Sequence, residues 1–504
     1  MIEVRGRDVP GRLERSPMQT RKAVAIIGGG ASGLLTAIQL LSQSGASGPR
    51  VYLIEKQDTF GFGAAYATND ASHLLNVRAG NMSGFPDDPR HFIDWLQADR
   101  AGKAAAATPC CFVSRQTYGH YLRSILRDAV TGAGAAGRFY IVPDEAVSIR
   151  AMPRGGYSVR LALGKDIEAN GAVLAFGNPP PHPPGVSDGG VFESPYYIGD
   201  PWSRDMSLLE PKDGTILILG TGLTMVDAVL SFVREGHRGP IVAISRRGLL
   251  PRRHALTAPS SPPPVPPRLI SSLAASLRAV RYAVREHTLR GGDWREVVDS
   301  LRPMTAAYWR SLPLVEQRRF LRHLRAWWDV HRHRLAPEVA NSLDALVEGG
   351  SLKIVRGRLK SFCLTGDVHA PVSATWTPYN TGGSTKMAVS RIVNCMGPGH
   401  DPRHSPFPLV RQMLAGGLIA ADELGLGVAV DGMGRVIGTR GEAQPALFAL
   451  GPATRGAFWE VTAIPDIRVK AAEVAKAILL AIQENGQEGR PSGYDCSEGN
   501  AAVN

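Results

Sequence analysis

The residues that most clearly predict a chemistry form a glycine-rich loop near the N-terminus. Gly28, Gly30 and Gly33 have the spacing of a dinucleotide-binding fingerprint. An apolar run of strand length, Ala23–Ile27, precedes them, and a helical apolar pattern follows. The first glycine permits a tight turn, the second admits a pyrophosphate to the backbone, and the third lets helix and strand pack closely. With Ser32 at the start of the helix, whose free N–H groups bind anions, the loop predicts a pyrophosphate site.

The strand expected after this helix indicates which dinucleotide is bound. Arg50–Ile54 is the strand, and it ends in Glu55. A carboxylate at this point accepts hydrogen bonds from ribose hydroxyls and repels a 2′-phosphate. The succession of strand, glycine loop, helix, strand and acid therefore favours FAD, and the alternative is a glycine turn that binds no ligand.

A second fingerprint lies near the middle of the chain. Gly220 and Gly222 follow another apolar strand, but Met225 replaces the third glycine, so this copy is weaker. The next strand ends not in an acid but in Arg246 and Arg247. Guanidinium groups at this position suit a 2′-phosphate and predict NADPH rather than NADH. The alternative is that the two arginines stack on adenine or face solvent.

The order of these patterns predicts an α/β protein with two Rossmann-like dinucleotide-binding domains, for FAD and NADP, and a helical insert. Two buried strands that end in glycine, Ala172–Phe176 and Arg391–Cys395, mark the crossings between domains. The expected boundaries are a flexible N-terminal tail (1–20), the first part of the FAD domain (21–180), the NAD(P) domain (181–390) with its insert at about 268–350, the second part of the FAD domain (391–485) and a C-terminal tail (486–504).

The composition is that of a globular protein of two or three domains. The 504 residues are 44% hydrophobic and 20% charged. No stretch approaches the roughly 18 apolar residues that a membrane span needs, and the polar N-terminus has no apolar signal-peptide core. Five cysteines give no disulfide framework, so we expect a cytoplasmic protein without membrane contact.

The formal net charge of +12 is concentrated in the expected insert, between Arg268 and Arg334. Carboxylates are interleaved with the arginines, which favours a solvated helical surface. Anionic cofactors or substrates are the second interpretation, and nucleic acid is not expected as a partner. The side chains that would line a cleft and meet an anion are Trp309, Phe320, Trp327, Trp328, Arg322, Arg325, Arg332 and Arg334. The oligomeric state is not indicated.

No metal site is expected. His400 and His404 have ligand-like spacing, but the prolines around them argue against the helix that would align them. The adjacent Cys110 and Cys111 do not form the C-x-x-C of a redox dithiol.

Longer motifs carry a resemblance to a known family. They are Gly61–Tyr66, His73–Ser83, Ser245–Pro251, His323–Pro337, Asn394–Pro402, Gly451–Arg455, Phe458–Glu460 and Pro465–Arg468. Through them the chain resembles the FAD/NAD(P)-binding proteins grouped with FAD-dependent urate hydroxylase and with the aspartate N-oxidising, nitrosuccinate-forming monooxygenase.

The resemblance implies an NADPH- and FAD-dependent monooxygenase that uses O₂. Its substrate would be small, polar, anionic and nitrogen-containing, oxidised by urate-like ring hydroxylation or by amino-group N-oxidation. One alternative is an FAD-dependent NAD(P)H oxidoreductase without oxygen transfer, and another is an RNA-associated flavoprotein.

The resemblance also implies flavin contacts at both ends of the FAD domain. Tyr66 ends a glycine-rich segment that such enzymes bring against the flavin. Related flavoproteins commonly bind the ribityl chain with an aspartate after the glycine of the last strand, but here Gly451 is followed by Pro452. Proline has neither a carboxylate nor an N–H, so Thr454 or Asp466 would supply that contact.

A polar loop is the candidate for the reacting site. Asn76, Arg78 and Asn81 follow closely on the segment that ends in Tyr66. Amides and a guanidinium near a flavin stabilise developing negative charge and hold an anionic substrate. The alternative is that Arg78 pairs with a structural carboxylate, Asp87 or Asp88.

Overall fold

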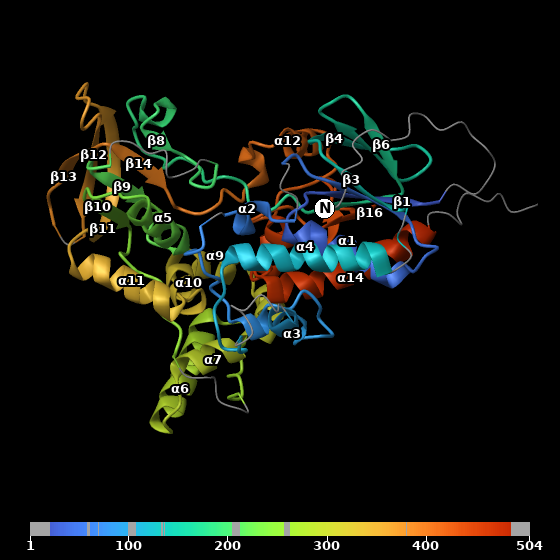
Figure 1. Ribbon diagram of the computed structural model, residues 1–504, viewed down its shortest axis with the longest axis horizontal. Helices are drawn as coiled ribbons and strands as arrows, with labels where there is room; N and C mark the ends of the chain where they lie inside the picture. Colours follow the sequence, from blue (N-terminus) through green and yellow to red (C-terminus); the bar gives the residue numbers. More distant parts are fainter. Residues whose placement is uncertain are drawn as a thin grey trace, which may run out of the picture.

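Two lobes, each built on its own β-sheet, make up the protein, with a group of helices between and below them (Figure 1). The computed structural model describes residues 21–484 except 58–60, 69, 99–106, 133–134, 136, 204–211, 257–262 and 380. The expected tails, 1–20 and 486–504, lie outside the described residues. In the part of the chain that is described, no helix is long and apolar enough to cross a bilayer.

The first lobe contains a six-stranded sheet in the order β15-β16-β7-β1-β2-β3. Its strands pair in parallel except β15 with β16, and Ile27 lies opposite Ile54 where β1 and β2 end. Their apolar runs are buried on both faces, which is typical of parallel strands. The strands are β1 (Ala23–Ile27), β2 (Arg50–Ile54), β3 (Phe139–Val142), β7 (Gly171–Leu174), β15 (Arg435–Ile437) and β16 (Ala443–Ala449).

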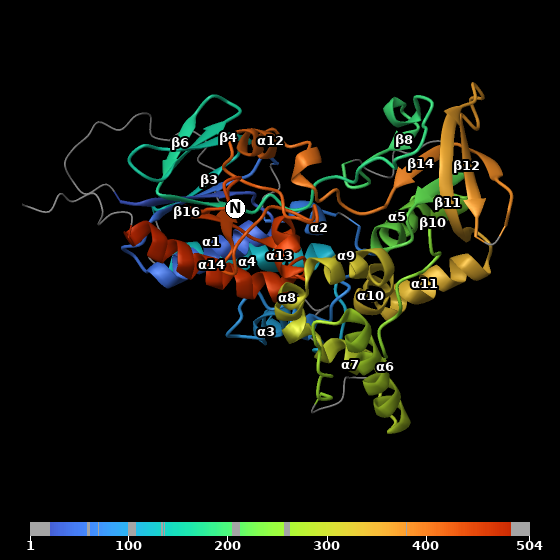
Figure 2. The same ribbon diagram turned by 180° about the vertical axis from the view of Figure 1, so that it is seen from behind.

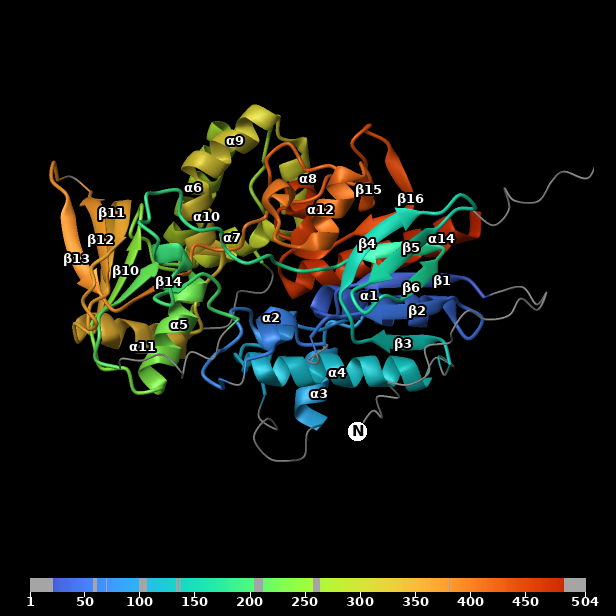
Figure 3. The same cartoon turned by 90° about the horizontal axis from the view of Figure 1, so that it is seen from above.

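Helices cover one face of this sheet, and a small antiparallel sheet with one helix covers the other. Figure 3 shows α1 and α4 beside the strands of the first lobe and β4–β6 near β1. The first face carries α1 (Ala31–Ser44), α3 (His91–Ala98), α4 (Arg115–Gly132) and α14 (Ile464–Glu484). The second carries β4 (Ala146–Ala151), β5 (Tyr157–Leu161), β6 (Asp166–Ala169) and α12 (Pro408–Ala415).

The second lobe contains a seven-stranded sheet in the order β13-β12-β11-β10-β9-β14-β8. Helices α5 (Leu223–Arg234) and α11 (Pro337–Glu348) pack on one face. The strands are β8 (Tyr197–Ile198), β9 (Ile216–Leu219), β10 (Ile241–Ser245), β11 (Leu352–Leu364), β12 (Val372–Pro378), β13 (Thr385–Val389) and β14 (Arg391–Asn394).

One strand lies in a different sheet from the one expected. We assigned the strand beginning at Arg391 to the second part of the FAD domain, but β14 pairs in parallel with β9 in the second lobe. That assignment is wrong, because Arg391–Asn394 completes the second sheet and the chain crosses between lobes only afterwards. An apolar run that ends in glycine is compatible with either sheet, because a strand's own sequence does not determine which strand it pairs with.

The segment predicted as a helical insert, about 268–350, contains α6 to α10 and ends in α11, which packs on the second sheet. Figures 1 and 2 show α6 and α7 projecting below the lobes, and Figure 2 shows α8 beside α13. The helices are α6 (Leu273–Leu289), α7 (Trp294–Ser300), α8 (Arg302–Ser311), α9 (Leu314–His323) and α10 (Arg325–Arg332). Short turns near the fingerprints are α2 (Gly63–Tyr66), η1 (Ala79–Asn81), η5 (Gly451–Thr454) and α13 (Arg455–Phe458).

Candidate dinucleotide sites and the interface between the lobes

The first fingerprint forms an open cradle at the end of β1. Gly28 has a φ of 108°, and a Cβ there would lie 2.3 Å from the Ala175 carbonyl oxygen. A Cβ on Gly33 would lie 1.9 Å from the Gly28 oxygen, so both glycines are required by packing. At Gly30 the nearest atom would be the Cα of Gly63 at 3.6 Å. The second glycine therefore borders free space, as pyrophosphate binding requires.

The start of α1 offers backbone donors to this space. Gly30 caps the helix without a side-chain hydrogen bond, so its first N–H groups are available for an anion. Ser32 is buried here, and a Cβ on Gly451 would lie 2.4 Å from its Oγ. The end of β16 is thus brought against the fingerprint.

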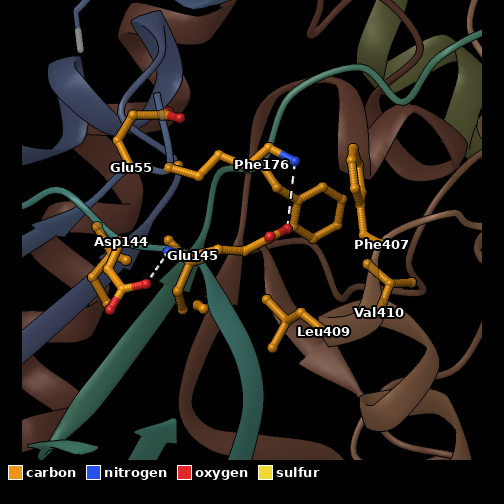
Figure 4. A pocket seen from close by; sticks show the side chains of 12 residues that line it. Glu55, Asp144, Glu145, Phe176, Phe407, Leu409 and Val410 are labelled. Carbon is orange, nitrogen blue, oxygen red and sulfur yellow. Dashed lines mark hydrogen bonds and ion pairs between the residues drawn. The ribbon is translucent and has the colours of Figure 1, made fainter. Parts of the chain in front are cut away.

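A cavity of ≈ 90 Å³ opens beside Glu55 at the ends of β1 and β2. Figure 4 shows Glu55 at one end of this cavity and the rings of Phe176 and Phe407 across from it, with centroids 6.0 Å apart. Glu55 Oε2 accepts a hydrogen bond from the Gly29 N–H at 2.8 Å, which holds the carboxylate next to the fingerprint. Aromatic walls and a carboxylate at the edge fit an adenosine, with the ribose hydroxyls toward Glu55.

The segment that ends in Tyr66 lies on the fingerprint loop. The Gly61 N–H donates to the Gly29 carbonyl oxygen at 2.8 Å. Tyr66 packs against Tyr118 with ring centroids 5.0 Å apart, and burial raises the pKa of its phenol while Arg115 opposes the rise. The neutral phenol thus lies in the first lobe close to the expected cofactor site.

The second fingerprint has the same construction without the third glycine. A Cβ on Gly220 would lie 2.4 Å from the Cys395 carbonyl oxygen, whereas one on Gly222 would meet nothing within 4 Å. Met225, which replaces the third glycine, is fully buried in the core, whereas a glycine there would let the helix pack closely on the strand. Because β9 lies between β10 and β14, this cradle is at the crevice where α/β sheets bind ligands.

The two arginines after β10 have different surroundings. Arg246 is exposed. Arg247 donates through Nη2 to the carbonyl oxygens of Arg322 and His323 at 3.2 and 3.1 Å, at the end of α9. Arg246 is therefore the more accessible group for a 2′-phosphate, and Arg247 ties the loop to the insert.

The polar loop of the candidate reacting site meets the second lobe. His254 Nε2 donates to the Asn76 carbonyl oxygen at 3.0 Å, and Arg78 Nη2 donates to the Ala255 carbonyl oxygen at 2.9 Å. Burial, and then the nearby Arg334, lower the pKa of His254 to about 4, so its ring is neutral. Asn76 and Arg78 are partly buried in this interface. Asn81 is exposed, and its N–H donates to the Arg78 carbonyl oxygen at 2.9 Å.

A buried polar network joins the lobes next to this loop, and the sequence did not reveal it. His73 Nε2 lies 2.9 Å from Ser231 Oγ, which donates to Asp70 Oδ2 at 3.1 Å. Arg115 pairs with Asp227 at 2.8 Å. Burial raises the pKa of the Asp227 carboxyl, and Arg115 opposes the rise. Because α5 begins at the second fingerprint, the network fixes that cradle relative to the first lobe.

The last helix of the first lobe is tied to the insert. Asp466 Oδ2 pairs with Arg302 Nη2 of α8 at 2.5 Å. Thr454, the other residue considered in place of the missing aspartate, is buried and donates to the Gly451 carbonyl oxygen at 3.0 Å. Both side chains thus have protein partners.

A strained turn precedes α14. Trp459 has φ 42° and ψ −64°, and the Glu460 N–H donates to the Phe458 carbonyl oxygen at 2.6 Å. This γ-turn with positive φ is rare, and such backbone costs about 1–3 kcal/mol. Rings of the insert hold the indole, with the centroids of Trp309 and Phe320 at 4.8 and 5.1 Å.

Comparison with known protein families agrees with the geometry of the first cradle. Residues 25–179 match the FAD-NAD(P)-binding protein family. No curated protein matches the sequence. The first lobe therefore carries an FAD/NAD(P)-binding segment.

Solved structures show the same fold along most of the chain. L-lysine 6-monooxygenase from Pseudomonas syringae is 16% identical, with a TM-score of 0.62 over 92% of this chain and 99% of that one. The ornithine N-hydroxylase of Kutzneria sp. 744, with reduced FAD, NADP⁺ and L-ornithine, is 16% identical (TM-score 0.56; 91% and 99%). A bacillithiol disulfide reductase from Bacillus cereus is 14% identical (TM-score 0.52; 91% and 99%).

The chain has the fold of FAD-dependent oxidoreductases. This confirms the expected α/β architecture with two dinucleotide-binding folds.

Proposed function

We propose that the protein is an NADPH- and FAD-dependent monooxygenase that oxidises a small, polar, anionic, nitrogen-containing substrate. The observation that carries the proposal is the pair of open cradles at Gly30 and Gly222, one at the end of each central parallel strand. Two such cradles in one chain suit a hydride donor and a hydride acceptor. Bound FAD, once reduced by NADPH, would supply the activation of O₂.

The residues around the cradles provide binding and orientation. The N-terminus of α1 would hold the FAD pyrophosphate, and Glu55 the adenosine ribose. Arg246 would hold the 2′-phosphate of NADPH. The buried contact between Arg115 and Asp227 keeps the two lobes in one orientation, and a fixed orientation is what hydride transfer between two bound cofactors requires.

The substrate class rests on the sequence resemblance and on the monooxygenases of lysine and ornithine that share the fold. Both support amino-group N-oxidation, and the resemblance alone supports urate-like ring hydroxylation. Asn76 and Arg78 are the candidates for contact with the reacting atoms, because they lie together where the two lobes meet.

The test begins with the absorbance spectrum of the purified protein, which we expect to be that of a flavoprotein with FAD. NADPH consumption, O₂ uptake and hydrogen peroxide are then measured with urate, amino acids and diamines. A substrate that lowers the peroxide formed per NADPH supports the monooxygenase. If one hydrogen peroxide forms for each NADPH consumed with every compound, the result favours the oxidoreductase without oxygen transfer. Steeply salt-dependent binding of RNA by the flavin-containing protein favours the RNA-associated alternative.

A further inference from the structure

A cavity of ≈ 590 Å³ lies where α11 of the second lobe meets α7 and α10. Its volume is within the range of about 300–1,000 Å³ that small-molecule sites commonly have. Helices α7, α10 and α11 contribute Trp294, His331 and Leu343 to the lining, and the segment 248–253 after β10 forms another wall. Figure 1 shows α7 below α10 and α11. The cavity is therefore built by the junction of the second lobe with the helices that project from it.

The segment 248–253 stands between this cavity and the second fingerprint. Leu249 lines the cavity, whereas its carbonyl oxygen accepts a hydrogen bond at 2.6 Å from the Oγ1 of Thr221, which lies between the two cradle glycines. In the described chain, neither glycine of that cradle lines the cavity. The cavity is thus a space next to the second cradle and not a part of it.

Part of the lining is apolar and firmly held. Leu343 is 1% exposed, and Leu335 and Ala340 are buried with it in the core on the second sheet. The Arg252 N–H donates to the Val330 carbonyl oxygen at 2.9 Å, and the Leu335 N–H donates to the Arg252 carbonyl oxygen at 2.8 Å. The backbone around the cavity is therefore fixed before any ligand binds, which lowers the entropy cost of binding.

Cations outnumber carboxylates around the cavity. Arg253 pairs with Asp344 at 2.5 Å, and Arg295 pairs at 2.9 Å with Asp293, which lies just outside the lining. Arg252 also lines the cavity, is exposed, and has no ion pair among the described residues. With Asp293 included, three guanidinium groups therefore face two carboxylates. An anionic group in the cavity would meet one arginine that is available to pair with it.

Two rings at the cavity favour a planar ligand. Trp294 and His331 meet edge to face, with ring centroids 5.1 Å apart. His331 Nδ1 donates to the Trp327 carbonyl oxygen at 2.7 Å, which fixes the orientation of the imidazole and turns the role of acceptor over to Nε2. An indole beside apolar side chains suits an aromatic ring, and a guanidinium matches a carboxylate with two parallel hydrogen bonds.

We propose that this cavity is a third ligand site, which binds a small planar aromatic acid. The aromatic ring packs against Trp294 and Leu343, and the carboxylate pairs with Arg252. The inference goes beyond the proposed function, because the site lies outside both dinucleotide cradles and takes neither FAD nor NADPH.

The test measures binding of 2-naphthoate and of its uncharged analogue 2-naphthamide to the purified full-length protein by isothermal titration calorimetry. Each titration is run with and without excess NADP⁺. We expect saturable binding of naphthoate under both conditions and about tenfold weaker binding of naphthamide. Arg252→Met should weaken naphthoate binding about tenfold, and Trp294→Leu should weaken the binding of both compounds. The control, Arg318→Met, removes an exposed arginine of α9 and should change neither affinity.

The ratio of the two affinities separates a lost cation from a structural defect. Arg252→Met should abolish the preference for naphthoate and leave naphthamide binding unchanged, whereas a distorted cavity would weaken both compounds alike. Absence of naphthoate binding, loss of that binding in excess NADP⁺, or an unchanged preference in Arg252→Met overturns the inference. Because neither flavin nor turnover is measured, these outcomes are independent of whether the proposed oxygenation is correct.

Discussion

His254 should make the free energy of unfolding depend on pH. Its buried ring donates to the Asn76 carbonyl oxygen across the interface between the lobes, and its pKa is lowered to about 4. In the unfolded chain a histidine takes a proton below a pKa of about 6.5. The unfolded state therefore binds more protons between these values, so stability is complete above about pH 6.5 and is lost as the pH falls toward 4.

The magnitude follows from the size of the shift. One pKa unit corresponds to about 1.4 kcal/mol, so His254 accounts for about 3 kcal/mol in full and about 2 kcal/mol by pH 5. His254→Gln keeps an N–H donor for Asn76 but cannot be protonated. Urea unfolding of the wild type and the variant between about pH 8 and pH 5 should show the variant losing about 2 kcal/mol less.

Two features of this experiment keep it specific. Burial also holds His400 neutral, so its protonation destabilises the fold over the same pH range. The wild type and the variant therefore both become less stable in acid, and only the difference between them reports on His254. His404→Gln, at an exposed histidine, is the matched control and should follow the wild type. If His254→Gln and the wild type lose the same free energy of unfolding on acidification, the ring is not held neutral by burial and the reasoning fails.

Three further outcomes are expected. Gly30→Val should yield folded but colourless protein, because its side chain enters the free space of the cradle, whereas Gly33→Ala should lower the melting temperature as well. Arg246→Ala should raise the KM for NADPH about tenfold to a hundredfold more than the KM for NADH. Arg247→Ala should also lower the melting temperature, because it removes the hydrogen bonds to α9. Equal increases in the KM for both nucleotides would exclude a phosphate contact. Arg78→Ala should keep FAD but release hydrogen peroxide in place of product, and normal coupled turnover would remove this loop from the active site.

The sequence determined the cradles and the strands that carry them. Glycine spacing, strand-length apolar runs and the acid at Glu55 are local patterns with steric and electrostatic causes, so they predicted β1, β2 and the open positions at Gly30 and Gly222. Because the glycine fingerprint occurs twice, the sequence also predicted two dinucleotide-binding folds.

Tertiary structure decided which segments meet, because partners far apart in the chain leave no local pattern. The sheet to which Arg391–Asn394 belongs depended on the neighbouring strand, not on its own apolar run. The contact of His73 with Ser231, and the turn at Trp459 held by insert helices more than a hundred residues earlier, appear only when the lobes pack. A charge that is well solvated in the unfolded chain needs a partner in the interior, and only the packed lobes bring Asp227 to Arg115.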